Sequence, residues 1–219
     1  MDERTTGLIL RTRPLTETSL IVHWVTRDFG RLATVAKGAR RPKSPFQGKL
    51  DLFYLAELSF LRSRRSELHT LREIVLRETH PALRTDLESL QQAAYCAALI
   101  EQATECETPL TEVFQLLENL LKQLAAPSAP PRTIFTFEIK LLAELGLQPD
   151  LAASKLTPGA RQLLQKFLNE DWPALRPVQL SAAQNAELSR FLGAFILHHL
   201  GAIPRARDAA LNLSAGLGG

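Results

Sequence analysis

The sequence predicts a multi-domain α+β fold, in which a small β-barrel comes first and a bundle of helices follows. The first 80 residues contain five runs rich in Val, Ile, Leu, Thr and aromatic residues, a composition that favours strands. The later residues are rich in Ala, Leu, Gln and Glu, with apolar residues spaced three and four apart as in helices. The pair His80-Pro81 separates the two compositions, so we expect a domain boundary there.

The N-terminal runs favour a five-stranded barrel of the oligonucleotide/oligosaccharide-binding (OB) type. Turn residues separate the runs: Pro14 follows the first, and Asp28-Phe29-Gly30 predicts a hairpin with glycine in a left-handed turn position. No helix of any length is expected between the runs, which suits a small closed barrel. The expected strands are residues 8–13, 19–26, 31–37, 50–61 and 67–78. Residues 1–80 therefore form the first expected domain, an OB fold.

The second expected domain, residues 81–213, consists of helices. Capping residues and glycines mark several of their ends: Ser181 opens one helix and Gly146 closes another. The expected helices are residues 85–105, 108–125, 132–146, 154–170 and 181–200, with a short further element in 204–213. Residues 126–131, APSAPP, form an expected linker, and residues 214–219 an expected disordered tail.

Charge divides along the same boundary. Residues 1–80 contain 15 Lys and Arg against 9 Asp and Glu, a balance of +6, whereas the remaining residues contain 11 against 14, a balance of −3. A basic first domain predicts a polyanionic partner, and an uneven surface charge without functional meaning is the alternative.

The stretch KGARRPKSPFQGK, residues 37–49, contains five basic residues and no acid. It lies between the third and fourth expected strands. Lys and Arg that neutralise phosphates release condensed counterions, glycine allows close backbone approach, and aromatic rings stack on bases. We expect sequence-tolerant DNA binding here, against the alternative of a solvated loop that binds nothing. The candidate DNA-binding residues are Arg11, Arg13, Arg31, Lys37, Gly38, Arg40, Arg41, Lys43, Phe46, Lys49, Arg64 and Arg65.

Other chemistry finds little support in the sequence. It contains no GxSxG, Walker-type, HExxH or dinucleotide-binding motif, and no acidic cluster of the kind that a two-metal nuclease needs, so we expect no enzymatic activity. His198-His199 has no further ligand at metal-binding spacing, so no metal is expected there. No apolar run approaches membrane-spanning length and the N-terminus lacks a secretory layout, which together predict a cytoplasmic protein.

The segment GLILRTRPLTETSLIVHWVTRDFGRLATVAKGARRPKS resembles the N-terminus of the RecO family, bacterial mediators of DNA repair and recombination. The resemblance is dense over about the first 60 residues and holds only in outline over the helical remainder. It implies an OB fold followed by a helical domain. It also implies binding of single- and double-stranded DNA in the nucleoid, annealing of complementary strands, and help in loading recombinase on DNA coated by single-strand binding protein (SSB). RecR, SSB and, indirectly, RecA are the implied partners.

The sequence departs from this family in one region. Many members carry two C-x-x-C pairs that bind structural zinc in the helical domain, whereas residues 145–181 here contain no cysteine. No zinc or other cofactor is therefore expected. Apolar packing must hold the fourth helix instead.

An alternative function is that of a DNA-tethered adaptor, whose helical domain binds protein partners without annealing activity. A groove between helices accepts a short amphipathic or acidic segment in many complexes. We expect Arg132 and Lys140 to meet the acidic tail of SSB, with Phe135 or Leu141 beneath them. The opposing interpretation is that these two cations are ordinary surface residues.

Overall fold

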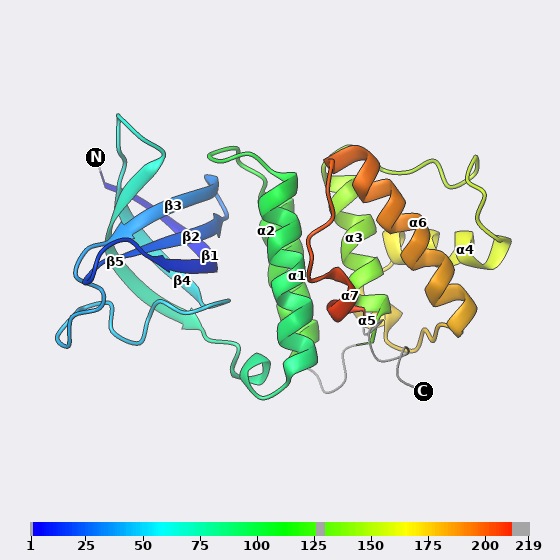
Figure 1. Cartoon of the computed structure of the whole chain (residues 1–219), viewed down its shortest axis with the longest axis horizontal. Coiled ribbons are helices and arrows are strands. Elements are labelled where there is room, and N and C mark those ends of the chain that lie inside the picture. The colour runs from blue at the N-terminus through cyan, green and yellow to red at the C-terminus, as the bar shows by residue number, and fades with distance from the viewer. Residues whose placement is uncertain (1, 126–129, 212–219) are drawn as a thin grey trace. The chain divides into compact units, whose positions relative to one another are not determined.

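The computed structural model describes residues 2–125 and 130–211, which divide into two compact units (Figure 1). The barrel unit contains the chain up to Pro81 together with Thr104–Glu118, and the helical unit contains Ala82–Ala103 and the chain from Asn119 onward. The sequence placed residues 104–118 in the helical domain, but in the structure they belong to the compact unit of the barrel. The expected tail, 214–219, lies outside the described residues, as does most of the expected linker.

Five strands form a closed barrel in the order β1-β2-β3-β5-β4. β3 and β5 pair in parallel, and all other neighbours pair antiparallel. The strands are β1 (Asp2–Pro14), β2 (Leu20–Thr26), β3 (Gly30–Ala36), β4 (Leu55–Leu61) and β5 (Leu68–Glu78). The predicted OB-type barrel is confirmed. The fourth strand begins later than expected, because residues 51–54 form a turn in which Phe53 has a positive φ of 62°.

Alternation of buried and half-buried residues builds the barrel core. β3 shows it most clearly: Leu32, Thr34 and Ala36 are buried and the residues between them are only partly so. The Trp24 indole is fully buried, and its Nε1 donates a hydrogen bond to Thr34 Oγ1 at 2.9 Å. The apolar core residues are Ile9, Val22, Trp24, Leu32, Ala36, Phe46, Ala56, Leu58, Phe60, Leu71 and Ile74.

The β2–β3 hairpin contains the glycine that the sequence predicts. Gly30 has a φ of 65°, in the left-handed region that glycine adopts without strain. Its carbonyl accepts a hydrogen bond from Thr26 Oγ1 at 2.8 Å. A Cβ at this position would lie 1.8 Å from the carbonyl oxygen of Thr108, so glycine also permits the close approach of residues 104–118.

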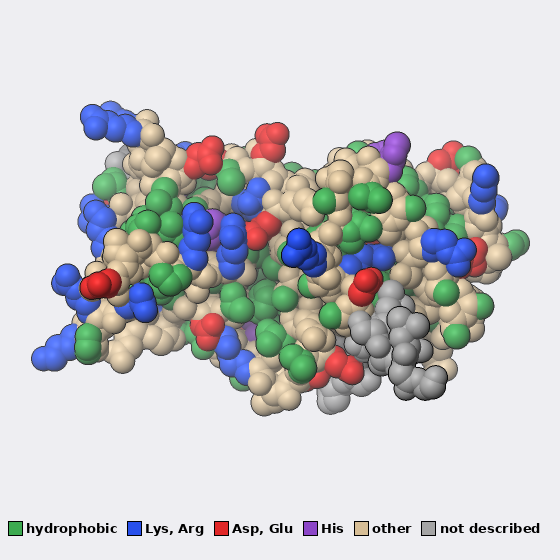
Figure 2. All heavy atoms as spheres, viewed as in Figure 1, with side chains coloured by type: hydrophobic (Ala, Val, Ile, Leu, Met, Phe, Trp, Pro, Cys, Tyr) green, Lys and Arg blue, Asp and Glu red, His purple; other side chains and the backbone are tan. Residues whose placement is uncertain are grey.

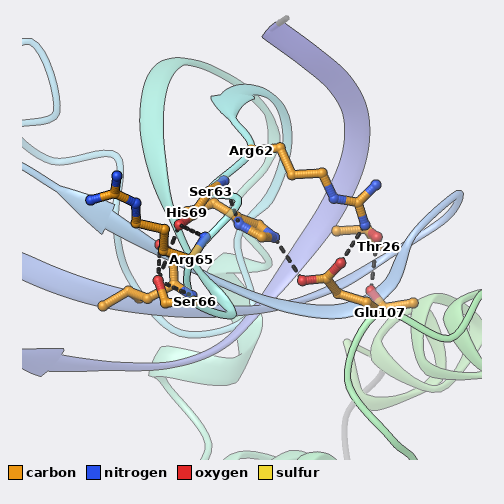
Figure 3. A network of polar contacts seen from close by, with 9 residues as sticks. Thr26, Arg62, Ser63, Arg65, Ser66, His69 and Glu107 are labelled. Atoms are coloured by element: carbon orange, nitrogen blue, oxygen red, sulfur yellow. Dashed lines mark hydrogen bonds and ion pairs between the residues drawn. The ribbon is translucent and has the colours of Figure 1, made fainter.

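Polar contacts hold residues 104–118 against the barrel. The Arg31 guanidinium donates to the hydroxyl and carbonyl oxygens of Thr104. The Glu107 backbone N–H donates to the Arg31 carbonyl at 2.7 Å. The Glu107 carboxylate contacts Arg62 and lies 3.0 Å from Nε2 of the buried His69, as Figure 3 shows. These contacts make residues 104–118 part of the barrel unit, although they are distant from the strands in sequence.

The helices follow the predicted order with adjusted ends. They are α1 (Leu87–Ala103), α2 (Thr111–Leu124), α3 (Arg132–Glu144), α4 (Pro158–Asn169), α5 (Trp172–Leu175), α6 (Ala182–Leu200) and α7 (Arg207–Ala210), with a 3₁₀ turn at Pro81–Arg84. Ser181 forms a capping box with Gln184, which confirms the predicted start of α6. α4 starts later than expected because Thr157 is its N-cap, and α5 was not predicted. None of the described helices is long and apolar enough to cross a membrane.

A buried ion pair joins helices of the helical unit. Arg207 on α7 contacts the fully buried Glu138 on α3 with two hydrogen bonds, of 2.7 and 3.0 Å. Tyr95 on α1 donates to the same carboxylate at 2.5 Å, and Arg207 also donates to the Ser189 carbonyl on α6 at 3.1 Å. Burial raises the pKa of Tyr95, and the Glu138 charge raises it further, so its hydroxyl remains a donor. Four helices therefore share one hydrogen-bonded centre.

Candidate nucleic-acid interface

The basic loop, Lys37–Lys49, starts where three strands meet. Pro14 at the end of β1 pairs with Leu20 at the start of β2, and Leu20 pairs with Ala36 at the end of β3. The loop leaves directly after Ala36 and leads toward β4, so it connects the third and fourth strands as predicted. Arg13, exposed at the end of β1, belongs to the same edge of the barrel.

Consecutive turns give the basic loop a defined backbone. Backbone hydrogen bonds of 3.1 Å run from Arg41 to Gly38, from Ser44 to Arg41, from Gln47 to Ser44 and from Lys49 to Phe46. A preceding turn is closed by a hydrogen bond of 3.3 Å from the Ala39 N–H to the Ala36 carbonyl, and Gly38, its third residue, has the positive φ of 70° that glycine adopts at this position. The cations are therefore presented on a folded scaffold.

The β1–β2 connection supports the basic loop from the side. The Arg40 backbone N–H donates to the Thr18 carbonyl at 3.0 Å, and the Gly38 N–H donates to Ser19 Oγ at 3.3 Å. The Arg40 guanidinium reaches the Thr16 carbonyl at 3.4 Å. These bonds hold the N-terminal half of the loop beside the end of β1.

The cations of the basic loop lack acidic partners. Within residues 2–125 and 130–211, the side chains of Lys37, Arg41 and Lys43 are exposed and form no hydrogen bond or ion pair. Elsewhere on the barrel such pairs do form: Arg77 contacts Glu57 at 2.6 Å. Figure 2 shows Lys and Arg side chains projecting from the part of the molecule that the barrel occupies. Uncompensated cations on a fixed backbone favour a polyanion as the ligand.

The remaining predicted residues of the barrel do not all join this edge. Arg11 is exposed on β1, two residues before Arg13 and on the same strand face. Arg64 and Arg65 lie in the β4–β5 connection, which enters the start of β5. Because β5 runs parallel to β3, that connection lies toward the other end of the paired strands from Lys37. Figure 1 shows the two connections extending from different sides of the barrel.

Two of the predicted DNA contacts have other tasks. Phe46 is only 7% exposed and packs in the barrel core, so its ring cannot stack on a base while the core is intact. The single aromatic side chain of the loop is therefore its anchor in the core. The Arg31 guanidinium is engaged with Thr104, and we no longer expect it to contact phosphate.

The predicted partner site on α3 is not formed. Phe135 and Leu141 are 0% and 1% exposed, so they lie in the core of the helical unit and offer no surface. Arg132 donates to the Arg176 carbonyl at 2.7 Å, after the end of α5, and Lys140 donates to the Leu168 carbonyl at 2.9 Å, in the last turn of α4. Burial lowers the pKa of both cations. Their contacts satisfy carbonyl groups at helix ends, which helices leave without intrahelical partners.

An apolar groove lies elsewhere on the helical unit. It has a volume of about 480 Å³ and runs along α6, where Phe191, Phe195 and His199 follow one another at every fourth position. The centroid of the Phe195 ring lies 6.2 Å from the ring centroid of Phe191 and 4.2 Å from that of His199. The charged residues that line the groove are Lys155, Glu187 and Arg190. Spacing of four along a helix is the signal that marks this groove in the sequence.

No metal site is found in the described part of the chain. Among these residues, no three His, Cys, Asp or Glu side chains come together in a group that could hold an ion. The region of residues 145–181, which lacks the cysteines of a zinc module, contains the capped helix α4 with Leu164 and Phe167 buried. The residues present therefore do not fit a zinc ion.

Comparisons with known proteins match the N-terminal and the C-terminal parts of the chain to the same family. The family model described as "Recombination protein O N terminal" matches residues 1–80, and that described as "Recombination protein O C terminal" matches residues 84–154 and 151–208. The DNA repair protein RecO of Rhodopirellula baltica is 32% identical over 143 residues, 65% of this chain and 53% of that protein. RecO of Bacillus subtilis is 33% identical over 145 residues, 66% of this chain and 56% of that protein.

One relative is similar over nearly its whole length. The DNA repair protein RecO of Symbiobacterium thermophilum is 27% identical over 228 aligned positions, which cover 87% of this chain and 89% of that protein. With the first two relatives the similarity spans about half of their length. The matches of both family models, on an OB-type barrel followed by helices, show that this chain belongs to the RecO family.

Proposed function

We propose that this protein is a non-enzymatic mediator of DNA repair and recombination that binds DNA without sequence specificity through the basic loop. The relatives are DNA repair proteins by name, and the proposal extends that role to this chain. The observation that carries it is the set of uncompensated cations on a folded loop at one edge of an OB-type barrel. Contacts to phosphate position a strand and do not read its sequence.

Annealing of complementary single strands follows from the same charges. Two strands repel one another through their phosphates, and cations that neutralise part of that charge reduce the repulsion. The proposed cellular role is to anneal strands and to help load RecA on DNA coated with SSB, together with RecR. The proposal places this work in the cytoplasm, on the nucleoid.

The test is annealing of two labelled complementary oligonucleotides across a salt series. Wild-type protein is expected to accelerate annealing, and the acceleration is expected to fall as salt rises. The variant Lys37/Arg40/Arg41/Lys43→Ala is expected to lose it, because each removed cation gives up a phosphate contact. The matched control removes four exposed cations of the helical unit, Lys155/Lys166/Arg190/Arg205→Ala, and should anneal as wild type does.

DNA binding without annealing in the wild-type protein would favour the other function, a DNA-tethered adaptor. The groove along α6 supports partner binding by the helical unit, since half-buried phenylalanine rings beside cations suit an amphipathic acidic peptide. The proposal therefore moves the contact with the acidic tail of SSB from α3 to this groove.

Binding of a fluorescent peptide with the sequence of that tail tests the location. Arg190→Glu reverses a charge at the groove and is expected to weaken binding about tenfold or more, because it places like charges against each other. Arg132→Glu, on α3, is the comparison, with its fold checked by thermal unfolding. Loss of binding in folded Arg132→Glu together with wild-type affinity in Arg190→Glu would return the site to α3.

A further inference from the structure

Between the basic loop and the barrel lies a pocket whose apolar part no phosphate contact would occupy. Its volume is about 320 Å³, at the lower end of the range of roughly 300–1,000 Å³ typical of small-molecule sites. Residues on both sides of the loop line it, from the start of β2 to the residue before β4. All of them belong to the barrel unit.

The pocket has an apolar wall. Leu20, Ala39, Leu50 and Tyr54 are partly buried residues that pack against the barrel core, and the buried Phe46 lies among them. The wall is therefore supported from behind by the core. A flat apolar ligand would gain contact there without ordering a mobile segment.

The rim of the pocket carries two arginines, polar groups and one carboxylate, that of the exposed Asp51. Arg40 and Arg41 line it, and both side chains are exposed. Gln47 adds an exposed side-chain amide, which can both donate and accept hydrogen bonds. Guanidinium groups bind phosphate, and an amide matches the polar edge of a base.

We propose that this pocket holds one unpaired nucleotide of a bound single strand, with its base against the apolar wall and its phosphate at Arg40 and Arg41. In a duplex each base face is covered by its neighbours in the stack, so only an unpaired nucleotide can enter. The pocket would thus make the loop prefer single-stranded DNA to duplex. This inference rests on the proposed function, since it assigns a further contact to the same DNA-binding loop.

The test compares three labelled ligands in fluorescence anisotropy: an oligothymidylate, an abasic oligomer of the same length and charge, and a duplex. Wild-type protein is expected to bind the oligothymidylate about tenfold more tightly than the abasic oligomer, the size of effect that base contacts give. Equal affinity for these two ligands would overturn the inference, and this comparison needs no variant.

Ala39→Leu fills the pocket without removing a charge. It is expected to abolish the preference for thymidylate and to leave abasic and duplex binding unchanged. The matched control, Ala152→Leu, adds the same side chain at an exposed site of the helical unit and should keep the preference. If Ala39→Leu does not fold, Gln47→Trp fills the pocket from its exposed rim. A preference that survives in a folded, filled variant would also overturn the inference.

The two proposals fail in different ways. If Lys37/Arg40/Arg41/Lys43→Ala binds the abasic oligomer as tightly as wild type does, the proposed DNA interface itself is wrong. If that variant loses abasic binding but wild-type protein shows no preference for bases, the loop binds phosphates and only the nucleotide pocket is refuted.

Discussion

At the scale of single residues, His69 shows how a buried titratable group contributes to the barrel unit. Its Nδ1 accepts a hydrogen bond from the Ser63 backbone N–H at 3.2 Å, so Nε2 carries the proton that faces Glu107. The ring also stacks on Phe60, with centroids 5.2 Å apart. Burial lowers the pKa of His69 below its ordinary value of 6.5; the Glu107 charge opposes this shift and Arg62 adds to it.

This pKa predicts the direction of a pH dependence. In the unfolded chain His69 takes up a proton as pH falls through 6.5, whereas in the folded protein it does so only at lower pH. The unfolded state then binds more protons, so the contribution of His69 is present at neutral pH and is lost as pH falls below 6.5. Thermal unfolding of wild type and His69→Gln across pH 5–8 measures it, with the wild-type melting temperature falling more steeply on acidification. Equal slopes would contradict this account, because the two proteins differ only at residue 69.

At the scale of elements, the β2–β3 hairpin and residues 104–118 depend on Gly30. Gly48, in the basic loop, offers a matched comparison, because it also has a positive φ but no atom lies within 4 Å of where its Cβ would be. Gly48→Ala is therefore expected to lose about 1 kcal/mol from backbone strain alone. Gly30→Ala is expected to lose roughly 2 kcal/mol more, because its Cβ meets the Thr108 carbonyl.

Urea denaturation of the two glycine variants measures the difference in their free energies of unfolding. The m-values should also be compared, since a detached segment would reduce the surface exposed on unfolding. Equal losses of stability in the two variants would show that residues 104–118 do not pack tightly on the hairpin.

The elements also show which parts of the fold could be predicted from the sequence. Strands, turns and helix caps depend on neighbouring residues, so the barrel, the Gly30 turn and the Ser181 cap could be predicted. The contact of Arg31 with Thr104 joins residues that are 73 positions apart in the sequence, and no local sequence pattern predicts it. The placement of residues 104–118 was missed for that reason.

The candidate site divides in the same manner. The basic loop was predicted from its charge and its place between strands. The role of Phe46 was not, because a lone aromatic residue in a loop has the same sequence pattern whether it anchors the loop or faces a ligand. Likewise the sequence pattern of Arg132 and Lys140 is that of surface cations. Only the folded chain shows that they donate hydrogen bonds to carbonyl groups at helix ends.

At the scale of the whole molecule, the two units are proposed to have separate tasks. The first 80 residues carry a balance of +6, but the four glutamates of residues 104–118 reduce the balance of the barrel unit to +2. The proposed attraction for DNA therefore comes from the local charge of the basic loop and not from the net charge of the unit. The helical unit is held by its own buried ion pair of Glu138 and Arg207 and carries the apolar groove on α6. Substitutions in the loop should therefore change DNA binding while leaving the groove unaltered, and the reverse should hold for the groove.

The salt dependence of single-strand binding tests the central claim most directly. If the basic loop neutralises about five phosphates, the slope of log K against log salt should be about −3.5 for wild type, and Lys37/Arg40/Arg41/Lys43→Ala should flatten it to about −0.7. Binding constants for single-stranded DNA, measured at one temperature in a series of potassium chloride concentrations, give both slopes. A slope that the variant leaves unchanged would contradict the account and would place the DNA on another surface of the protein.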